Sequence, residues 1–71
     1  MSNAEHLVKM ANQIEVFFRT ETDRNVAVEN ISNHIKRFWD PRMRKQILHH
    51  INAGGLGLDD LATDAIKSLE K

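Results

Sequence analysis

Cysteine is absent from this chain of 71 residues. Without thiols, the chain forms neither disulfides nor thiolate metal sites, and it holds no iron–sulfur cluster of the usual cysteine-ligated kind. A chain of this length buries only about 60% of the surface that its unfolded form exposes, so small domains usually need a disulfide, a metal or a partner. The sequence therefore predicts a single helical domain over residues 1–71, stabilised by close helix packing or by another chain.

Net charge and long apolar runs are lacking as well. Ten basic side chains balance ten acidic ones, whereas proteins that coat nucleic acids or anionic membranes carry a positive excess. The apolar run at residues 16–18, VFF, is too short for a transmembrane helix or a signal peptide. We therefore expect a cytoplasmic protein that binds neither nucleic acid nor membranes. Residues 1–3 are expected to be disordered or derived from an expression tag.

Apolar residues recur at helical spacing, and no stretch alternates with the period of a strand. This spacing predicts an all-α fold, a small compact bundle of four short antiparallel helices at about residues 4–19, 25–38, 41–53 and 58–70. The four apolar stripes consist of Leu7, Ala11, Ile14 and Phe18; Ala27, Ile31, Ile35 and Phe38; Met43, Ile47, His50 and Ile51; and Leu58, Leu61, Ala62, Ala65, Ile66 and Leu69.

Two local signals fix helix boundaries. Asp40 is an expected N-cap, and Pro41 fits the first helical position because its missing N–H would be unpaired there. Pro41 also disfavours α conformation at Asp40, so the preceding helix must end before it. Gly54 follows the last apolar residue of the third helix and is an expected C-terminal cap with positive φ.

The corner between the second and third helices, residues 36–45, is rich in cations and is called the basic corner below. It holds five Lys or Arg side chains against one acid, Asp40, and it includes the chain's single Trp. The Trp either packs over the start of the third helix, near Met43, or stands at the surface as an anchor for a partner. Because Trp and Arg are enriched at binding hot spots, the cluster favours a docking surface. The predicted partner-binding residues are Trp39, Arg42, Arg44 and Lys45, with Phe17 and Met10, otherwise core residues, as second choices.

No arrangement of residues in the sequence indicates catalysis. His49 and His50 are adjacent, so on a helix they point about 100° apart. His34 and His50 lie on apolar faces, where a hydrogen-bonded core histidine is commoner than a metal ligand. The segment GGLG at residues 54–57 lacks the preceding strand and the Lys-Ser/Thr of a phosphate-binding loop. We predict no catalytic residue, cofactor site or metal site in this chain.

Three segments carry a resemblance to a known family. LVKMANQI at residues 7–14 is followed by FFR, the central stretch HIKRFWDPRMR spans residues 34–44, and a glycine loop follows at residues 54–58. In this order they resemble the delta-subunit family of soluble NAD-dependent formate dehydrogenases, over about residues 7–61. Asp60 stands where that family's pattern suggests Pro.

The resemblance implies a non-catalytic small subunit that assists the assembly, stability or cofactor insertion of the catalytic subunit. In that family the enzyme oxidises formate at a molybdenum or tungsten bis-pterin guanine dinucleotide centre, and electrons pass through iron–sulfur clusters and a flavin to NAD. The larger subunits carry all these cofactors, so the resemblance implies none in this chain. Its expected partner is the catalytic subunit, and without that partner the isolated chain is expected to self-associate.

Two other functions stay open from the sequence. A free-standing chaperone for the molybdopterin guanine dinucleotide cofactor would use Arg42, Arg44 and Lys45 against its phosphates. A small helix-turn-helix DNA-binding regulator would use the second and third helices. The neutral total charge and the shortage of base-reading side chains, with Gln46 and Asn52 as the candidates, disfavour DNA binding.

Overall fold

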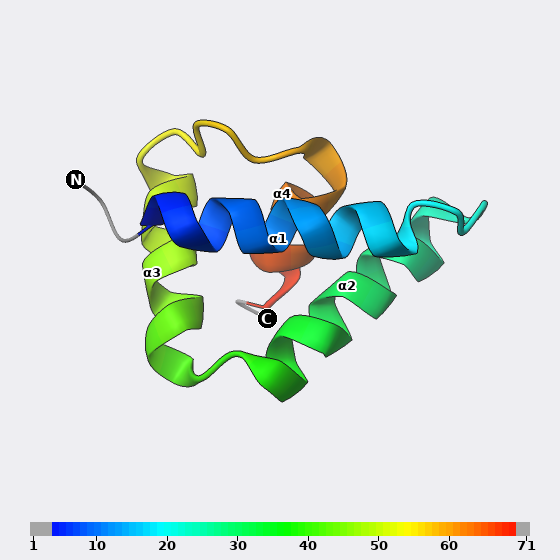
Figure 1. Ribbon diagram of the computed structural model, residues 1–71, viewed down its shortest axis with the longest axis horizontal. Coiled ribbons are helices and arrows are strands. Elements are labelled where there is room, and N and C mark those ends of the chain that lie inside the picture. Colours follow the sequence, from blue (N-terminus) through cyan, green and yellow to red (C-terminus); the bar gives the residue numbers. More distant parts are fainter. Residues whose placement is uncertain (1–3, 70–71) are drawn as a thin grey trace.

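Four helices account for most of the computed structural model, which describes residues 4–69 (Figure 1). They are α1 (Ala4–Phe18), α2 (Arg24–Phe38), α3 (Pro41–Asn52) and α4 (Asp60–Ser68). No strand occurs within residues 4–69, so the predicted all-α class is confirmed. The expectation for residues 1–3, and the predicted end of the last helix at residue 70, lie outside the described residues.

Aspartate side chains cap two of the helices. The Asp23 carboxylate accepts hydrogen bonds from the backbone N–H groups of Asn25 and Val26 at the start of α2. At the start of α3, the Asp40 carboxylate accepts one from the Met43 N–H at 3.0 Å, and Pro41 occupies the first turn. The predicted Asp-Pro corner between α2 and α3 is therefore confirmed, because both residues do what their chemistry favours there.

The end of α3 is closed by two glycines. The Gly54 N–H donates to the Ile51 carbonyl at 3.0 Å, and the Gly55 N–H donates to the His50 carbonyl at 2.9 Å. This pair of bonds is the Schellman pattern, which needs positive φ just past the helix. Gly54 and Gly55 have φ values of +124° and +66°. The predicted glycine cap is confirmed, and it turns the chain toward α4.

The core forms where the apolar stripes of all four helices meet. Ile31, Ile35, Ile47 and Ile66 are its largest fully buried side chains. The most extensive helix pairing joins α2 to α4. In Figure 1, α3 runs across the direction of α1 rather than beside it, so the helices cross instead of forming the predicted antiparallel array.

One stripe prediction is wrong at its last residue. Phe38 is 67% exposed, whereas Trp39 is 4% exposed and belongs to the core. The reason is the end of α2: Trp39 is the C-cap and has extended backbone angles, φ −94° and ψ 135°. Helical periodicity no longer applies at an extended residue, so the indole turns inward while Phe38 keeps its helical direction. Of the two positions that the sequence left open for Trp39, the structure has the packed one.

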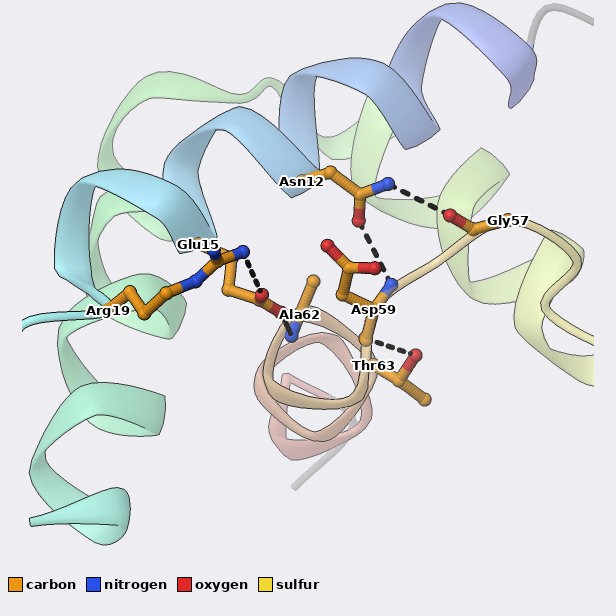
Figure 2. Close-up of polar contacts among 7 residues, drawn as sticks. All are labelled: Asn12, Glu15, Arg19, Gly57, Asp59, Ala62 and Thr63. Carbon is orange, nitrogen blue, oxygen red and sulfur yellow. Dashed lines mark hydrogen bonds and ion pairs between the residues drawn. The ribbon is translucent and has the colours of Figure 1, made fainter.

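Side chains from α1 hold the segment that leads into α4, as Figure 2 shows. The Asn12 side chain donates to the Gly57 carbonyl at 2.8 Å and accepts from the Asp59 N–H at 3.0 Å. The Glu15 carboxylate accepts from the Ala62 N–H at 3.0 Å. The Asp59 side chain makes no capping bond of its own, so the start of α4 is satisfied from α1 instead.

Candidate docking surface

An open apolar groove of about 390 Å³ lies between α1 and α2 and is called the aromatic groove below. Side chains on one face of α1 form one wall, and the last turns of α2 form the other. No Asp, Glu, Lys or Arg is among the described residues that line the groove. Its lining residues are Met10, Gln13, Ile14, Phe17, Phe18, His34, Phe38 and Trp39.

Exposed rings form the rims of this groove and a buried ring lies beneath them. Phe17 is 77% exposed and Phe38 is 67% exposed, while Trp39 is almost fully buried. Scattered single apolar residues on a surface need no explanation. Two exposed phenylalanines that line one concave apolar surface are instead typical of an interaction site.

The rings of the groove contact one another in a chain that links the two helices. Phe17 and Phe18 meet edge to face at a centroid distance of 5.1 Å. Phe18 lies 6.1 Å from the His34 ring, which in turn lies 4.7 Å from the Phe38 ring. Contacts of this kind add to area burial and hold the rings in defined orientations. The groove is therefore formed before any partner arrives.

A cation, Arg37, lies at the rim of the groove. The Arg37 guanidinium lies 5.8 Å from the centre of the Phe38 ring, within cation–π range. In the described part of the chain, the ion pairs join Arg19 to Glu15 and Arg24 to Asp64, so Arg37 has no acidic partner there. As far as residues 4–69 show, the rim presents a cation without an acidic partner next to apolar surface.

The predicted partner-binding residues divide into two groups. Met10, Phe17 and Trp39 line the aromatic groove, although Trp39 is its floor and not an exposed anchor. The three predicted cations of α3 do not line it. Among these cations, the Arg44 guanidinium donates to the Lys36 carbonyl at 2.9 Å and so ties α3 to the end of α2, while Arg42 and Lys45 are exposed.

Sequence reasoning missed two members of this surface. The helical stripe places Phe38 in the core, and the sequence offers His34 only as a core histidine or a metal ligand. The available signal was the pair Phe38-Trp39 directly before Asp-Pro, because a helix that ends between two adjacent residues no longer fixes the direction of the second side chain.

The described residues hold no group of three His, Cys, Asp or Glu side chains that would bind a metal ion. The His50 Nε2 donates to the Leu56 carbonyl at 2.8 Å, which fixes a proton on that nitrogen.

Within residues 4–69, no helix is long and apolar enough to cross a membrane.

Comparison with protein families gives a match over most of the chain. The model of the family described as NADH-dependent formate dehydrogenase delta subunit FdsD matches residues 6–66. This span includes α2 and α3, most of α1 and of α4, and every residue of the aromatic groove. No curated protein and no solved structure matches the chain.

Proposed function

Because the chain belongs to the NADH-dependent formate dehydrogenase delta subunit family, we propose that it is a non-catalytic accessory subunit that docks on the catalytic subunit of that complex. The aromatic groove is the surface with which it docks. The exposure of Phe17 and Phe38 on the two sides of this groove is the observation that carries the proposal.

Docking through this surface would stabilise both chains. Covering apolar surface contributes roughly 25 cal/mol for each Å² removed from water. A subunit that binds only the folded form of its partner also raises the partner's free energy of unfolding by mass action. The small chain would thereby keep the catalytic subunit folded during assembly and cofactor insertion.

In this proposal the chemistry belongs to the other subunits. The molybdenum bis-pterin guanine dinucleotide, the iron–sulfur clusters, the flavin and the NAD site are placed in the larger chains. The small chain contributes a contact surface, and the proposal assigns no reaction to it. The absence of Cys from the sequence fits that division, since a cysteine-ligated cluster has no ligand here.

The test is co-purification of the small chain with an affinity-tagged catalytic subunit after co-expression. The variant carries Phe17→Gln and Phe38→Gln, which remove both rims of the groove and keep helix-compatible side chains. The matched control is Val16→Gln, because Val16 is 55% exposed on the same helix but does not line the groove. We expect the double variant to be lost from the complex and the control to be retained. Equal retention of both would reject the groove as the docking surface.

A further inference from the structure

The backbone around the aromatic groove limits what can fill it. Both walls are helices, so their backbone groups are bonded within the helix up to its last turn. In the last turns, where a helix leaves carbonyls unpaired, the Phe18 carbonyl accepts from the Glu21 N–H and the Lys36 carbonyl accepts from Arg44. The polar side chains in the lining are those of Gln13 and His34. A buried backbone amide needs a hydrogen-bond partner. An extended peptide laid in the groove would lose its bonds to water and find almost no replacement.

A helix avoids that cost because its backbone hydrogen bonds are internal. Helix-in-groove recognition uses apolar side chains at i, i+3 or i+4, and i+7, which is one face of the incoming helix. The open shape and the apolar walls between α1 and α2 fit such a face. A small-molecule site of similar volume usually encloses most of its ligand's surface, whereas this groove is open.

The positive charge of Arg37 at the rim favours an incoming helix with an acidic residue on its flank. Arg37 lies against the Phe38 ring and has no acidic partner among residues 4–69. When a partner covers Phe38, water around the guanidinium is partly removed, and an unpaired cation becomes unfavourable there. A carboxylate on the incoming helix offsets this desolvation cost and accepts a charge-assisted hydrogen bond from Arg37.

We propose, on the basis of the docking function above, that the occupant of the aromatic groove is an amphipathic α-helix of the catalytic subunit. Its apolar face covers Phe17 and Phe38, and an Asp or Glu on its flank pairs with Arg37. A second copy of this chain is a poorer occupant. Two grooves facing each other across a twofold axis would place two Arg37 side chains in one interface without an acid in either lining.

The first experiment uses the full chain within the co-expressed complex. Benzoylphenylalanine, a photo-crosslinking aromatic residue, replaces Phe38, and in a control it replaces Val16, which lies outside the groove lining. After irradiation, mass spectrometry identifies the attached peptide. We expect the Phe38 position, and not the Val16 position, to crosslink to a catalytic-subunit segment with apolar residues at helical spacing and an Asp or Glu beside them.

Three results would overturn this inference: a crosslink to a second copy of the chain, a crosslink to a segment without helical spacing, or none while the complex still forms. If the small chain still co-purifies in these cases, it still docks on the catalytic subunit, but a crosslink to a second copy or the lack of a crosslink would move the contact to another surface. If the unmodified chain does not co-purify with the complex at all, the docking function itself fails.

The second experiment tests the charge. Arg37→Glu places like charges together and is expected to weaken binding to the catalytic subunit about tenfold. Lys67→Glu is the control, because Lys67 is also exposed but lies on α4, away from the groove lining. Its effect is expected to stay within about twofold. Equal losses for the two variants would show that Arg37 has no specific acidic partner.

Discussion

The Glu15 carboxylate on α1 accepts a hydrogen bond from the backbone N–H of Ala62 in the first turn of α4, at 3.0 Å. The two residues are 47 positions apart in sequence. The first N–H groups of a helix have no partner within that helix. Here a carboxylate from another helix fills the role of a cap, and its negative charge suits the positive end of the α4 dipole. Glu15 is 5% exposed, so the bond is shielded from water.

Removal of the Glu15 side chain is therefore expected to destabilise the fold. Glu15→Ala should lower the free energy of unfolding by about 1–3 kcal/mol, because a buried N–H loses its acceptor. Glu15→Gln keeps an acceptor oxygen and should cost less. Urea denaturation followed by circular dichroism measures both. Arg19→Ala is the control: it removes the exposed side of the Glu15–Arg19 pair and should change stability by no more than about 0.5 kcal/mol. Similar losses for Glu15→Ala and Arg19→Ala would contradict this assignment.

The Asn12 side chain should control the order of the segment between α3 and α4. Asn12→Ala removes both the bond to the Gly57 carbonyl and the bond from the Asp59 N–H. We expect faster hydrogen exchange at the Asp59 amide and a loss of about 1–2 kcal/mol in stability. Amide exchange measured by NMR reports the first effect. Asn33→Ala, at an exposed position of α2, is the matched control and should leave that amide unchanged.

The neighbouring rings Phe38 and Trp39 should behave in opposite ways on substitution. Trp39→Ala leaves a cavity in the core and should cost about 3–5 kcal/mol, enough to unfold much of so small a domain. Phe38→Ala should change stability by less than about 1 kcal/mol because most of that ring is in water. Thermal melting of the two variants measures both losses of stability. A greater loss for Phe38→Ala would mean that the two burial assignments are reversed.

The burial of Trp39 also changes how its role in binding can be tested. Loss of partner binding by a Trp39 variant would follow from unfolding alone, whatever the docking surface is. The same holds for Arg44, since its bond to the Lys36 carbonyl joins α3 to the end of α2. Phe17, Phe38 and Arg37 are exposed and give interpretable binding experiments.

The glycine cap of α3 gives a test of backbone strain without steric crowding. A Cβ at Gly54 would meet no atom within 4 Å, yet φ is +124° there. Gly54→Ala should therefore cost about 1–3 kcal/mol from backbone strain alone. A chemically synthesised chain with D-alanine at this position should lose much less, because positive φ suits the D configuration. Equal melting temperatures for the L and D variants would refute the strain explanation.

Local sequence signals were sufficient for most of the fold. Asp40-Pro41 and Gly54 act through their own backbone and side-chain preferences, so their positions at helix boundaries could be predicted without any tertiary information. The stripes around Ile31 and Ile47 repeat with the helical period, and their burial followed from it. The last helix begins at Asp60, later than the predicted residue 58. Asp59 is extended there, with ψ 160°, and is bonded to Asn12.

The docking surface was harder to predict because it depends on tertiary contacts. The stripe places Phe17 at its edge as a second-choice candidate, but nothing local shows that its exposure exceeds that of Phe18. The burial of Trp39 in place of Phe38 depends on the backbone angles of a single residue, the C-cap of α2. The contacts of Asn12 and Glu15 join positions more than 40 residues apart, and no periodic pattern encodes such pairs.

The two exposed rings also have a consequence for the chain before it has found a partner. Quality-control proteases and chaperones select polypeptides that display apolar side chains, and Phe17 and Phe38 display theirs in the native fold. An orphan copy should thus be short-lived in the cell, and the supply of the larger chain would set its abundance. Pulse-chase labelling with and without co-expression of that chain measures the half-life, and Phe17→Gln with Phe38→Gln should lengthen it in the orphan state.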